Sequence, residues 1–294
     1  MPLTEQERVL RRLELDVTRR LDGLLHGDHR GLRAGEGIEP GEARLYAPGD
    51  DVRRIDWAVT ARTGEPHVRP AVADHELVAW VVADLSASLD FGTARCEKRD
   101  LAVAATAAVA FLTSRAGNRV GALVLDADGT HVVPARGGGD PSRALVHRVM
   151  AAPRGDGRGR TDLAAALREV DRLATRRGLV AVVSDWLAPA GWERSLRVLA
   201  RRHDVLAVEV VDPRELELPD VGVLTVVDPE TGDRLEVQTS DADLRRRYAA
   251  AAGDQRERIR RLIRGAGADH VVLRTDRDWL LDLVRFVERR RRAR

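Results

Sequence analysis

Residues 77–88 read Leu-Val-Ala-Trp-Val-Val-Ala-Asp-Leu-Ser-Ala-Ser, and the fold prediction starts from them. The continuous apolar run Leu77 to Ala83 has the length of a strand and is typical of a central parallel strand covered on both faces. The pentad Asp84-Leu85-Ser86-Ala87-Ser88 then supplies one carboxylate and two hydroxyls, the hard oxygen ligands that Mg2+ or Mn2+ takes. The alternative is a strand-end turn in which these side chains bond backbone amides.

Beyond this stretch, apolar strand-like runs alternate with helical patterns. We expect strands at 119–125, 130–135, 179–184, 205–211 and 270–273, and helices at 98–115, 141–150, 162–176, 192–202, 241–265 and from 276. A hairpin is expected between 221–227 and 234–237. The alternation predicts an α/β fold with a doubly wound, mostly parallel sheet flanked by helices, because right-handed crossovers place helices on both faces.

Three segments are predicted along the chain. Residues 1–29 contain an amphipathic helix, since Leu10, Leu13, Val17, Leu21 and Leu24 recur at helical spacing. Residues 30–72 are rich in Gly, Pro and Arg, and we expect turns with short strands at most, in a loop-rich subdomain packed on the main domain. Residues 73–294 form the α/β domain, with the hairpin inserted near 221–238.

Composition narrows the possible partners and compartment. The 49 basic and 47 acidic side chains leave a formal charge of +2, which gives nucleic-acid binding no support. Cys96 is the only cysteine, so no internal disulfide is possible. The first residues lack a signal-peptide apolar core, and the stretch 101–112 is too short to cross a bilayer, so we expect a cytoplasmic protein.

A run of arginines near residue 294 is the local exception to this charge balance. We interpret it as a solvated helix end, with peripheral contact to anionic lipid or phosphate as the alternative. The run consists of Arg289, Arg290, Arg291, Arg292 and Arg294.

Two further polar positions follow the same logic as Asp84. In open parallel sheets, ligands bind beyond the carboxyl ends of strands, near the point where the strand order reverses. Asp185 follows the apolar run 179–184, and Thr161 stands where a glycine-rich loop opens a helix. The Thr161 hydroxyl therefore has two competing uses, as a helix N-cap or as a metal ligand.

This ordered set resembles the von Willebrand factor type A domain, an α/β domain of Rossmann-type topology. The metal-ion-dependent adhesion site of that domain uses a D-x-S-x-S loop, a threonine from a second loop and an aspartate from a third. The resemblance implies a site for Mg2+, or for Mn2+ or Ca2+ in its place, formed by Asp84, Ser86, Ser88, Thr161 and Asp185.

A second stretch of sequence resembles a narrower family within the proteins that contain this domain. Residues 44–57 read Arg-Leu-Tyr-Ala-Pro-Gly-Asp-Asp-Val-Arg-Arg-Ile-Asp-Trp and are similar to the signature of the domain of unknown function 58 family, which joins this segment to a von Willebrand type A domain. The resemblance implies a MoxR-type AAA+ ATPase as partner and a chaperone-like role in assembly. The signature residues are Arg44, Tyr46, Pro48, Gly49, Asp50, Asp51, Arg53, Arg54, Asp56, Trp57 and Arg62.

The signature has two interpretations. Arginines and carboxylates that pair with each other would fix a loop-rich subdomain, because the planar guanidinium binds a carboxylate through two bonds, and Trp57 would serve as an apolar anchor. Alternatively, part of the cluster is a recognition surface.

Three functions follow from these motifs. The leading hypothesis is a metal-dependent protein-interaction module without catalytic residues, in which an acidic side chain of a client or partner completes the coordination of the metal. The second is a metal-dependent hydrolase with Asp90 or Asp162 as general base, although no histidine adjoins the three loops. The third is a polyanion-binding face on the basic helices 245–264 and 279–292, against which their interspersed acids argue.

Overall fold

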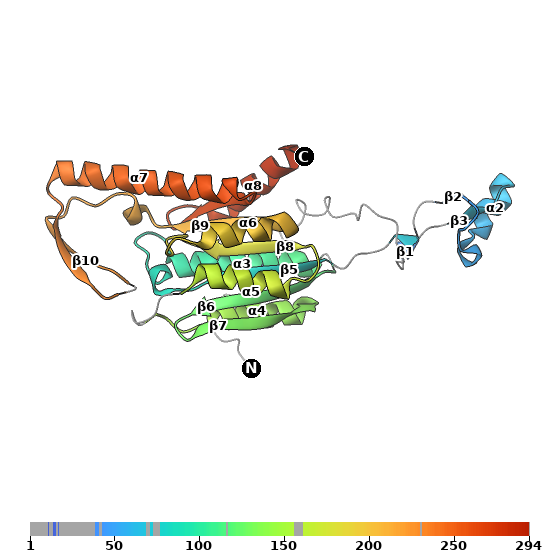
Figure 1. Ribbon diagram of the computed structural model, residues 1–294, viewed down its shortest axis with the longest axis horizontal. Coiled ribbons are helices and arrows are strands. Elements are labelled where there is room, and N and C mark those ends of the chain that lie inside the picture. Colours follow the sequence, from blue (N-terminus) through green and yellow to red (C-terminus); the bar gives the residue numbers. More distant parts are fainter. Residues whose placement is uncertain are drawn as a thin grey trace. The chain divides into compact units, whose positions relative to one another are not determined.

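The protein divides into two compact units, residues 26–76 and residues 1–25 with 77–294 (Figure 1). The computed structural model describes residues 11, 14, 15, 17, 39, 40, 43–68, 71, 72, 77–115, 117–155, 161–229 and 231–293. The larger unit contains the central sheet, and the smaller unit contains the arginine-rich signature.

The central sheet has six strands in the order β12-β9-β8-β5-β6-β7. Neighbouring strands are parallel except for edge strand β7, which pairs antiparallel with β6. Along the chain, β5 is the first strand of this sheet, and β6 and β7 are added on one side of it. The chain then crosses to the other side of β5 and forms β8, β9 and β12, so the strand order reverses between β5 and β8. The doubly wound α/β prediction is therefore confirmed. The strands are β5 (Val78–Asp84), β6 (Arg119–Asp126), β7 (Gly129–Gly137), β8 (Leu179–Ser184), β9 (Asp204–Val211) and β12 (Asp269–Arg274).

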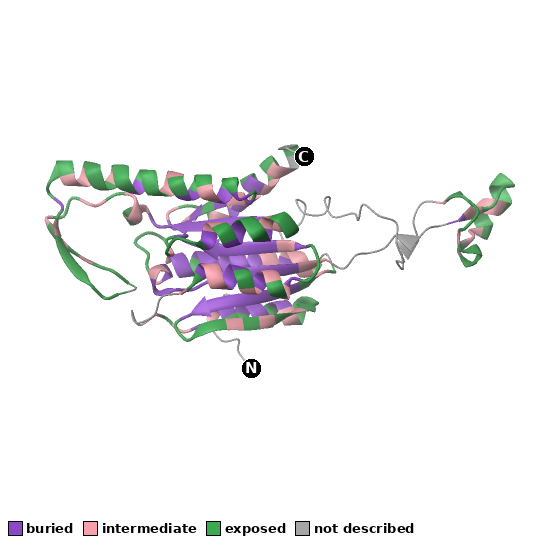
Figure 2. Ribbon diagram, in the orientation of Figure 1, coloured by how far each residue is buried: buried purple, intermediate pink, exposed green. Residues whose placement is uncertain are grey.

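Helices cover both faces of the sheet, and the four inner strands β5, β6, β8 and β9 are buried between them, whereas edge strand β7 has no buried residue (Figure 2). Successive residues of β5 point to opposite faces, so Ala79, Val81 and Ala83 enter one core while Trp80 and Val82 enter the other. The first core is closed by α3 (Lys98–Arg115), α4 (Gly139–Met150) and α8 (Trp279–Ala293), and the second by α5 (Leu163–Leu173), α6 (Trp192–Arg202) and α7 (Ala242–Gly265).

Helix α3 lies at the centre of the first core. It contacts β5, β6, β8, β9 and β12, and six of the residues from 102 to 110 are alanine. Small side chains on nearly every side let the helix approach the strands closely, and its first turn brings Lys98 and Arg99 to the carboxyl edge of the sheet as buried charges.

The predicted elements of this unit are present, with shifts of a few residues at their ends. Helix α5 ends at Leu173, earlier than the expected 176. Val17 is helical and fully buried in the first core, whereas Leu10, Leu13, Leu21 and Leu24 lie outside the described residues. The predicted hairpin is confirmed as β10 (Val223–Val227) paired antiparallel with β11 (Arg234–Gln238).

In its described residues, the smaller unit contains four two-residue strands and two short helices. As expected, the strands are short: β1 (Glu39–Pro40) pairs with β4 (Ala71–Val72), and β2 (Arg44–Leu45) pairs with β3 (His67–Val68). The 3-10 helix η1 (Val52–Arg54) and helix α2 (Trp57–Thr63) were not predicted, and the expectation of turns and strands alone was wrong. The Asp56 side chain caps α2 by accepting from Ala58 N and Val59 N, and Gly64 ends it in the left-handed conformation.

Within the smaller unit, two of the expected arginine–carboxylate pairs are present. Arg44 binds Asp50 through two bonds of 2.7 and 2.6 Å, and Arg53 Nε donates to Asp51 at 3.1 Å. Trp57 is 71% exposed, and its role as an anchor of this unit against the sheet stays a prediction. The side chain of Arg54 lies outside the described set.

At the other end of the chain, Arg289 and Arg292 are exposed, in agreement with the interpretation of a solvated helix end, whereas Arg290 is paired. Helix α8 continues to Ala293, and Arg290 Nε contacts Asp269 on β12 at 2.8 Å. Across the described part of the chain, no helix combines the length and the apolar character that a membrane span requires.

Candidate metal centre

Asp84 and Asp185 lie at the ends of β5 and β8, the two strands between which the sheet order reverses. The register places Ala83 beside Val183, so Ser184 comes next to Asp84. Asp84 Oδ2 accepts from Ser184 Oγ at 2.7 Å, and its Oδ1 accepts from Ser86 N at 3.1 Å. These two bonds fix the Asp84 carboxylate across the strand ends.

The loop after β5 turns through the 3-10 helix η2 (Ala87–Leu89) and keeps both serine hydroxyls at the site. Ser86 Oγ lies 3.1 Å from Ser88 Oγ, and the Ser88 hydroxyl bonds Asp185. The strand-end turn considered as the alternative is present in part, since Ser86 N does bond Asp84. The hydroxyls nevertheless connect the first loop to the third.

Thr161 joins the same site. It lines one cavity of about 1100 Å³ together with Asp84, Ser86, Ser88 and Asp185. The N-cap use of Thr161 was wrong, because the side chain of Asp162 caps α5 by accepting from Ala165 N at 2.8 Å. All five residues implied by the resemblance therefore lie around one cavity at the carboxyl edge of the sheet.

Asp84 is a buried carboxylate without a compensating charge. It is 2% exposed, and no lysine or arginine among the described residues pairs with it. Burial and the negative charge of Asp185 raise its pKa, and hydrogen bonds from Ser184 and Ser86 offset only part of this effect. Its ionised form is thus costly, and a bound cation would remove that cost.

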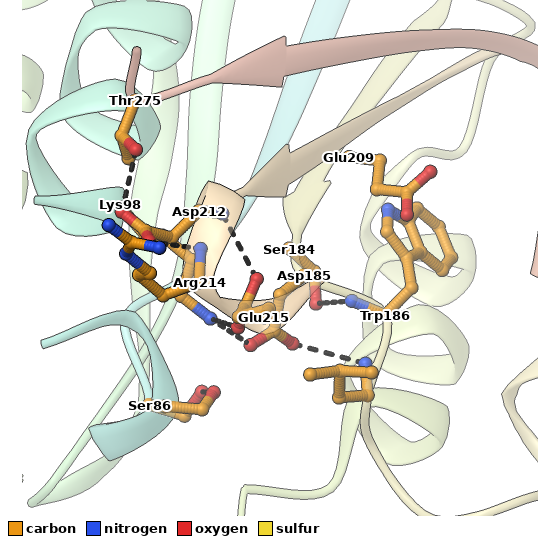
Figure 3. Close-up of polar contacts among 12 residues, drawn as sticks. Ser86, Lys98, Ser184, Asp185, Trp186, Glu209, Asp212, Arg214, Glu215 and Thr275 are labelled. Atoms are coloured by element: carbon orange, nitrogen blue, oxygen red, sulfur yellow. Dashed lines mark hydrogen bonds and ion pairs between the residues drawn. The ribbon is translucent and has the colours of Figure 1, made fainter. Parts of the chain in front are cut away.

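Asp185 is in the opposite situation, because Lys98 reaches it from α3 (Figure 3). Lys98 Nζ lies 2.9 Å from Asp185 Oδ2 and 2.5 Å from Glu215 Oε1, and the lysine is 1% exposed. Burial raises the pKa of Asp185, but Lys98 outweighs it and holds that pKa below its ordinary value. Burial likewise lowers the pKa of Lys98, but the two carboxylates outweigh it and the net shift is upward.

The charge network continues from Glu215 into helix α7. Arg256 Nη2 donates to Glu215 Oε2 at 2.9 Å, and Arg256 Nη1 donates to the Asp185 carbonyl at 2.9 Å and to Glu209 Oε1 at 3.1 Å. His270 Nε2 lies 2.7 Å from Glu209 Oε2. Buried ion pairs thus connect the third loop with the wall of the cavity.

Arg99 fixes the position of the first loop, which follows β5. Its guanidinium donates to the carbonyls of Leu85, Ala152 and Pro153 at 3.0 to 3.1 Å and binds the carboxylate of Asp90. These bonds tie the D-x-S-x-S loop to the segment that follows α4, so the position of Ser86 and Ser88 depends on Arg99.

Trp186 turns the chain immediately after Asp185. Its φ of 61° is left-handed, which is uncommon for a bulky residue. Trp186 N donates to Ser184 Oγ at 3.0 Å, and its indole N–H donates to the Val208 carbonyl at 3.2 Å. These contacts, with an edge-on contact to Trp192, hold the unusual backbone that aims Asp185 into the site.

The carboxylates that the hydrolase hypothesis offered as general bases both have partners in the folded chain. Asp90 binds Arg99 and accepts from Gly155 N at 2.9 Å, and Asp162 serves as the N-cap of α5. Asp90 also lines the cavity, and the hydrolase hypothesis stays a prediction.

The oxygen donors fit a hard divalent cation. Mg2+ commonly binds proteins through one or two carboxylates and keeps several waters, which matches two carboxylates and three hydroxyls that line one cavity. Within the described ranges, no cluster of three or more His, Cys, Asp or Glu side chains suggests a different kind of metal cage.

The sequence left four functional side chains unidentified: Lys98, Ser184, Glu215 and Arg256. A lysine in the first turn of an apolar helix is a weak indication of a functional residue, because its positive charge is unfavourable at the positive end of the helix dipole. Ser184 is the last residue of β8 and directly precedes Asp185, so the strand-end pattern that indicated Asp185 applies to it as well. Glu215 and Arg256 carry no local signal, since they reach the site only through the tertiary fold.

Comparisons with known proteins give the following relatives. The profile described as "Protein of unknown function DUF58" matches residues 42–258. Uncharacterized protein Rv1480 of Mycobacterium tuberculosis is 54% identical over 284 residues, which cover 97% of this chain and 89% of that protein. Uncharacterized protein MAV169 of Mycobacterium avium is 46% identical over 161 residues, which cover 55% of this chain and 95% of that protein.

Two solved structures are also similar. The conserved hypothetical protein BatB from Bacteroides thetaiotaomicron aligns with a TM-score of 0.45 and 13% identity, covering 74% of this chain and 99% of that one. The SpRpn10 VWA domain aligns with a TM-score of 0.38 and 11% identity, covering 71% of this chain and 93% of that domain.

Proposed function

This chain belongs to the family of proteins of unknown function DUF58, and from that membership and its von Willebrand factor type A-like fold we propose a metal-dependent protein-interaction module. One observation carries the proposal. Asp84 is a buried carboxylate without a compensating cation, and it shares an open cavity with a second carboxylate and three hydroxyls.

The residues of the three loops have separable roles in this proposal. Ser184 Oγ and Ser86 N orient Asp84, while Ser88 joins Asp185 to the first loop. A bound Mg2+ would supply the positive charge that Asp84 lacks and would accept a carboxylate from another protein as a further ligand. Affinity for the partner is then concentrated in one charge-assisted contact.

The walls of the cavity suit a peptide segment. Leu187 and Pro189 of the third loop, Leu224 and Val226 of β10, and Tyr248 of α7 line it together with the polar site. Apolar walls with a few convergent polar groups are the usual form of a specific binding site. A partner loop would therefore place apolar side chains against these walls and one acidic side chain at the polar end.

The partner that we propose is a MoxR-type AAA+ ATPase, with this chain as its adaptor in the assembly or maturation of a client. The basis is family resemblance in the signature segment and in the three loops. A purified MoxR-type AAA+ ATPase from the same organism is accordingly the first protein to test.

The test compares Asp84→Ala with Asp126→Ala. Asp126 is 3% exposed at the end of the adjacent strand β6 and does not line the cavity, so it controls for the loss of a buried carboxylate. Calorimetry should show Mg2+ binding by the wild type and Asp126→Ala only. Binding of the purified ATPase should require Mg2+ and disappear with EDTA or in Asp84→Ala. Equal binding by folded Asp84→Ala in EDTA would refute the proposal.

A further inference from the structure

Lys98 is the only lysine in the chain. All the other residues among its 49 lysines and arginines are arginines. This single ammonium is almost completely buried, and it lies between carboxylates from two different loops. A protein with so many arginines has placed its one lysine against a candidate metal ligand.

The ammonium has properties that a guanidinium lacks. It is a compact point charge with three rotatable donors, whereas arginine is a planar fork that fits one carboxylate edge-on. Between Asp185 Oδ2 at 2.9 Å and Glu215 Oε1 at 2.5 Å, the ammonium therefore resembles a small cation more than an arginine would.

We propose that Lys98 is a resident counter-ion of the metal centre, and that its ammonium exchanges with a divalent cation at Asp185. The inference rests on the proposed metal dependence and deepens it. In the absence of metal, Lys98 neutralises Asp185 and holds it beside Ser88. When a divalent cation binds, Lys98 gives up its bond to Asp185 because both cations require Oδ2, since Asp185 Oδ1 already accepts from Leu187 N at 3.1 Å.

Glu215 is the second half of this exchange. It keeps a carboxylate against Lys98 after Asp185 is released, so the ammonium is never buried alone. Glu215 is itself held in place, since its Oε2 accepts from Arg256 Nη2 at 2.9 Å and from Asp212 N at 3.1 Å. Lys98 therefore changes from two carboxylate partners to one.

The exchange has two consequences for binding. Lys98 weakens metal affinity, since metal must compete with an internal cation. It also links the metal to α7, because Arg256 shares Glu215 with Lys98 and contacts the Asp185 carbonyl. Metal binding is thereby coupled to α7, which forms one wall of the cavity in which the partner binds.

Calorimetric titration of the full chain with MgCl2, at fixed pH and ionic strength, tests the exchange. Lys98→Met should bind Mg2+ at least about tenfold more tightly than the wild type, because a nearby positive charge is removed. The double variant Lys98→Met with Glu215→Gln should do the same, and it removes one charge of each sign so that the buried site stays balanced. Arg214→Met is the matched control, since it removes a positive charge from the same cavity without touching Asp185, and its affinity should stay within about threefold of the wild type.

The outcomes separate the two proposals. If the wild type binds Mg2+ and the folded Lys98 variants bind it equally or more weakly, the exchange is wrong and the metal-dependent module stands. If Arg214→Met tightens binding as much as Lys98→Met does, the effect is a general field and the exchange is again wrong. If neither the wild type nor any of the variants binds Mg2+, both proposals fail.

A second measurement uses the wild type alone. Labelling with 15N-lysine gives a single side-chain ammonium signal, because the chain has one lysine. We expect MgCl2 to shift this signal in the wild type and not in Asp84→Ala. An unmoved signal at Mg2+ concentrations that saturate the calorimetric titration would overturn the exchange.

Discussion

Individual buried charges hold the three loops in place, and most of them have identified partners. Arg99 and Asp212 are the clearest examples away from the proposed metal ligands. Arg99 binds three carbonyls and a carboxylate, and Asp212 accepts from Thr93, Thr275 and the Arg214 amide. Because each group is desolvated, removing one leaves its partners unsatisfied, which makes these residues sensitive points of the structure.

Arg99→Met should destabilise the protein by about 3 to 5 kcal/mol, because it leaves three carbonyls without this donor and removes the buried guanidinium that pairs with Asp90. Arg154→Met is the control. That side chain is 60% exposed and pairs with Asp90 and Glu97 at the surface, so its loss should cost less than about 1 kcal/mol. Urea unfolding measures both values, and equal losses would contradict the assigned role of Arg99.

Asp212→Asn should show a pH-dependent loss of stability. Burial raises the pKa of Asp212, but the hydrogen bonds from Thr275 and Thr93 outweigh it and hold the pKa below its ordinary value. A carboxylate with a lowered pKa stabilises the fold above its unfolded pKa, near 4, and loses that contribution as the pH falls through its folded pKa. The deficit of the variant should thus be about 2 to 4 kcal/mol at pH 7 and should narrow below about pH 4.

Denaturant unfolding at several pH values checks this prediction. A deficit that stays constant from pH 7 to pH 3 would show that the ionised carboxylate is not the stabilising form.

The candidate ligands were predictable individually because each follows a strand or opens a helix. Asp84, Ser86, Ser88, Thr161 and Asp185 carry local signals of that kind. The partners of Lys98 are 87 and 117 residues away along the chain, so only the folded structure shows that its ammonium lies against the site.

Loops and helices of the larger unit meet closely where glycine permits it. Gly155 lies directly behind the first loop, where a Cβ atom would come 2.5 Å from Ala87 Cβ and 2.8 Å from Ala87 Cα. Gly253, in contrast, is exposed within α7 with open space around it. The two glycines therefore predict opposite effects of the same substitution.

Gly155→Ala should push the D-x-S-x-S loop out of position and weaken Mg2+ affinity by about 10- to 100-fold, the usual effect of disturbing the support of a metal ligand. Calorimetry on the folded variant measures the change. Unaltered affinity would mean that the loop tolerates the added methyl group.

Gly253→Ala should stabilise the protein by about 0.5 to 1 kcal/mol, because alanine restricts the unfolded chain and favours the helix interior. Thermal unfolding measures it, and Mg2+ affinity should not change. A destabilised variant would show that α7 needs glycine at this position for a reason other than helix propensity.

Strong periodicity made the long elements predictable, and weak periodicity hid the short ones. Helix α3 coincides with the expected 98–115, whereas α2 has seven residues and none of them is buried. A helix without an apolar face gives no pattern, and only its Asp56 cap and Gly64 stop were available as signals.

For the molecule as a whole, the division into two units is the main feature. Among the described residues, the first core of the larger unit is built from Val17 and from residues beyond 77, and the second core is built from residues beyond 77 alone. The alternation of strands and helices predicted the fold class. The strand order depends on pairing between distant segments, which the sequence does not display.

A protein in which residues 26–76 are replaced by a flexible Gly/Ser linker should keep the sheet unit folded. We expect a cooperative thermal transition within about 4 °C of the wild type, since the described residues of both hydrophobic cores are retained. Mg2+ affinity should also be retained, because the five candidate ligands belong to the remaining unit. Loss of the cooperative transition would contradict the independence of the larger unit.

The alanine content of α3 has a thermodynamic consequence for the site. Alanine has no side-chain rotamers to lose, so burying this helix on nearly every side costs little side-chain conformational entropy. Close contact with five strands then leaves the helix little freedom to rotate or slide. Lys98 and Arg99, in its first turn, share this rigidity, and the protein holds two desolvated cations at fixed positions without ordering a large number of flexible side chains.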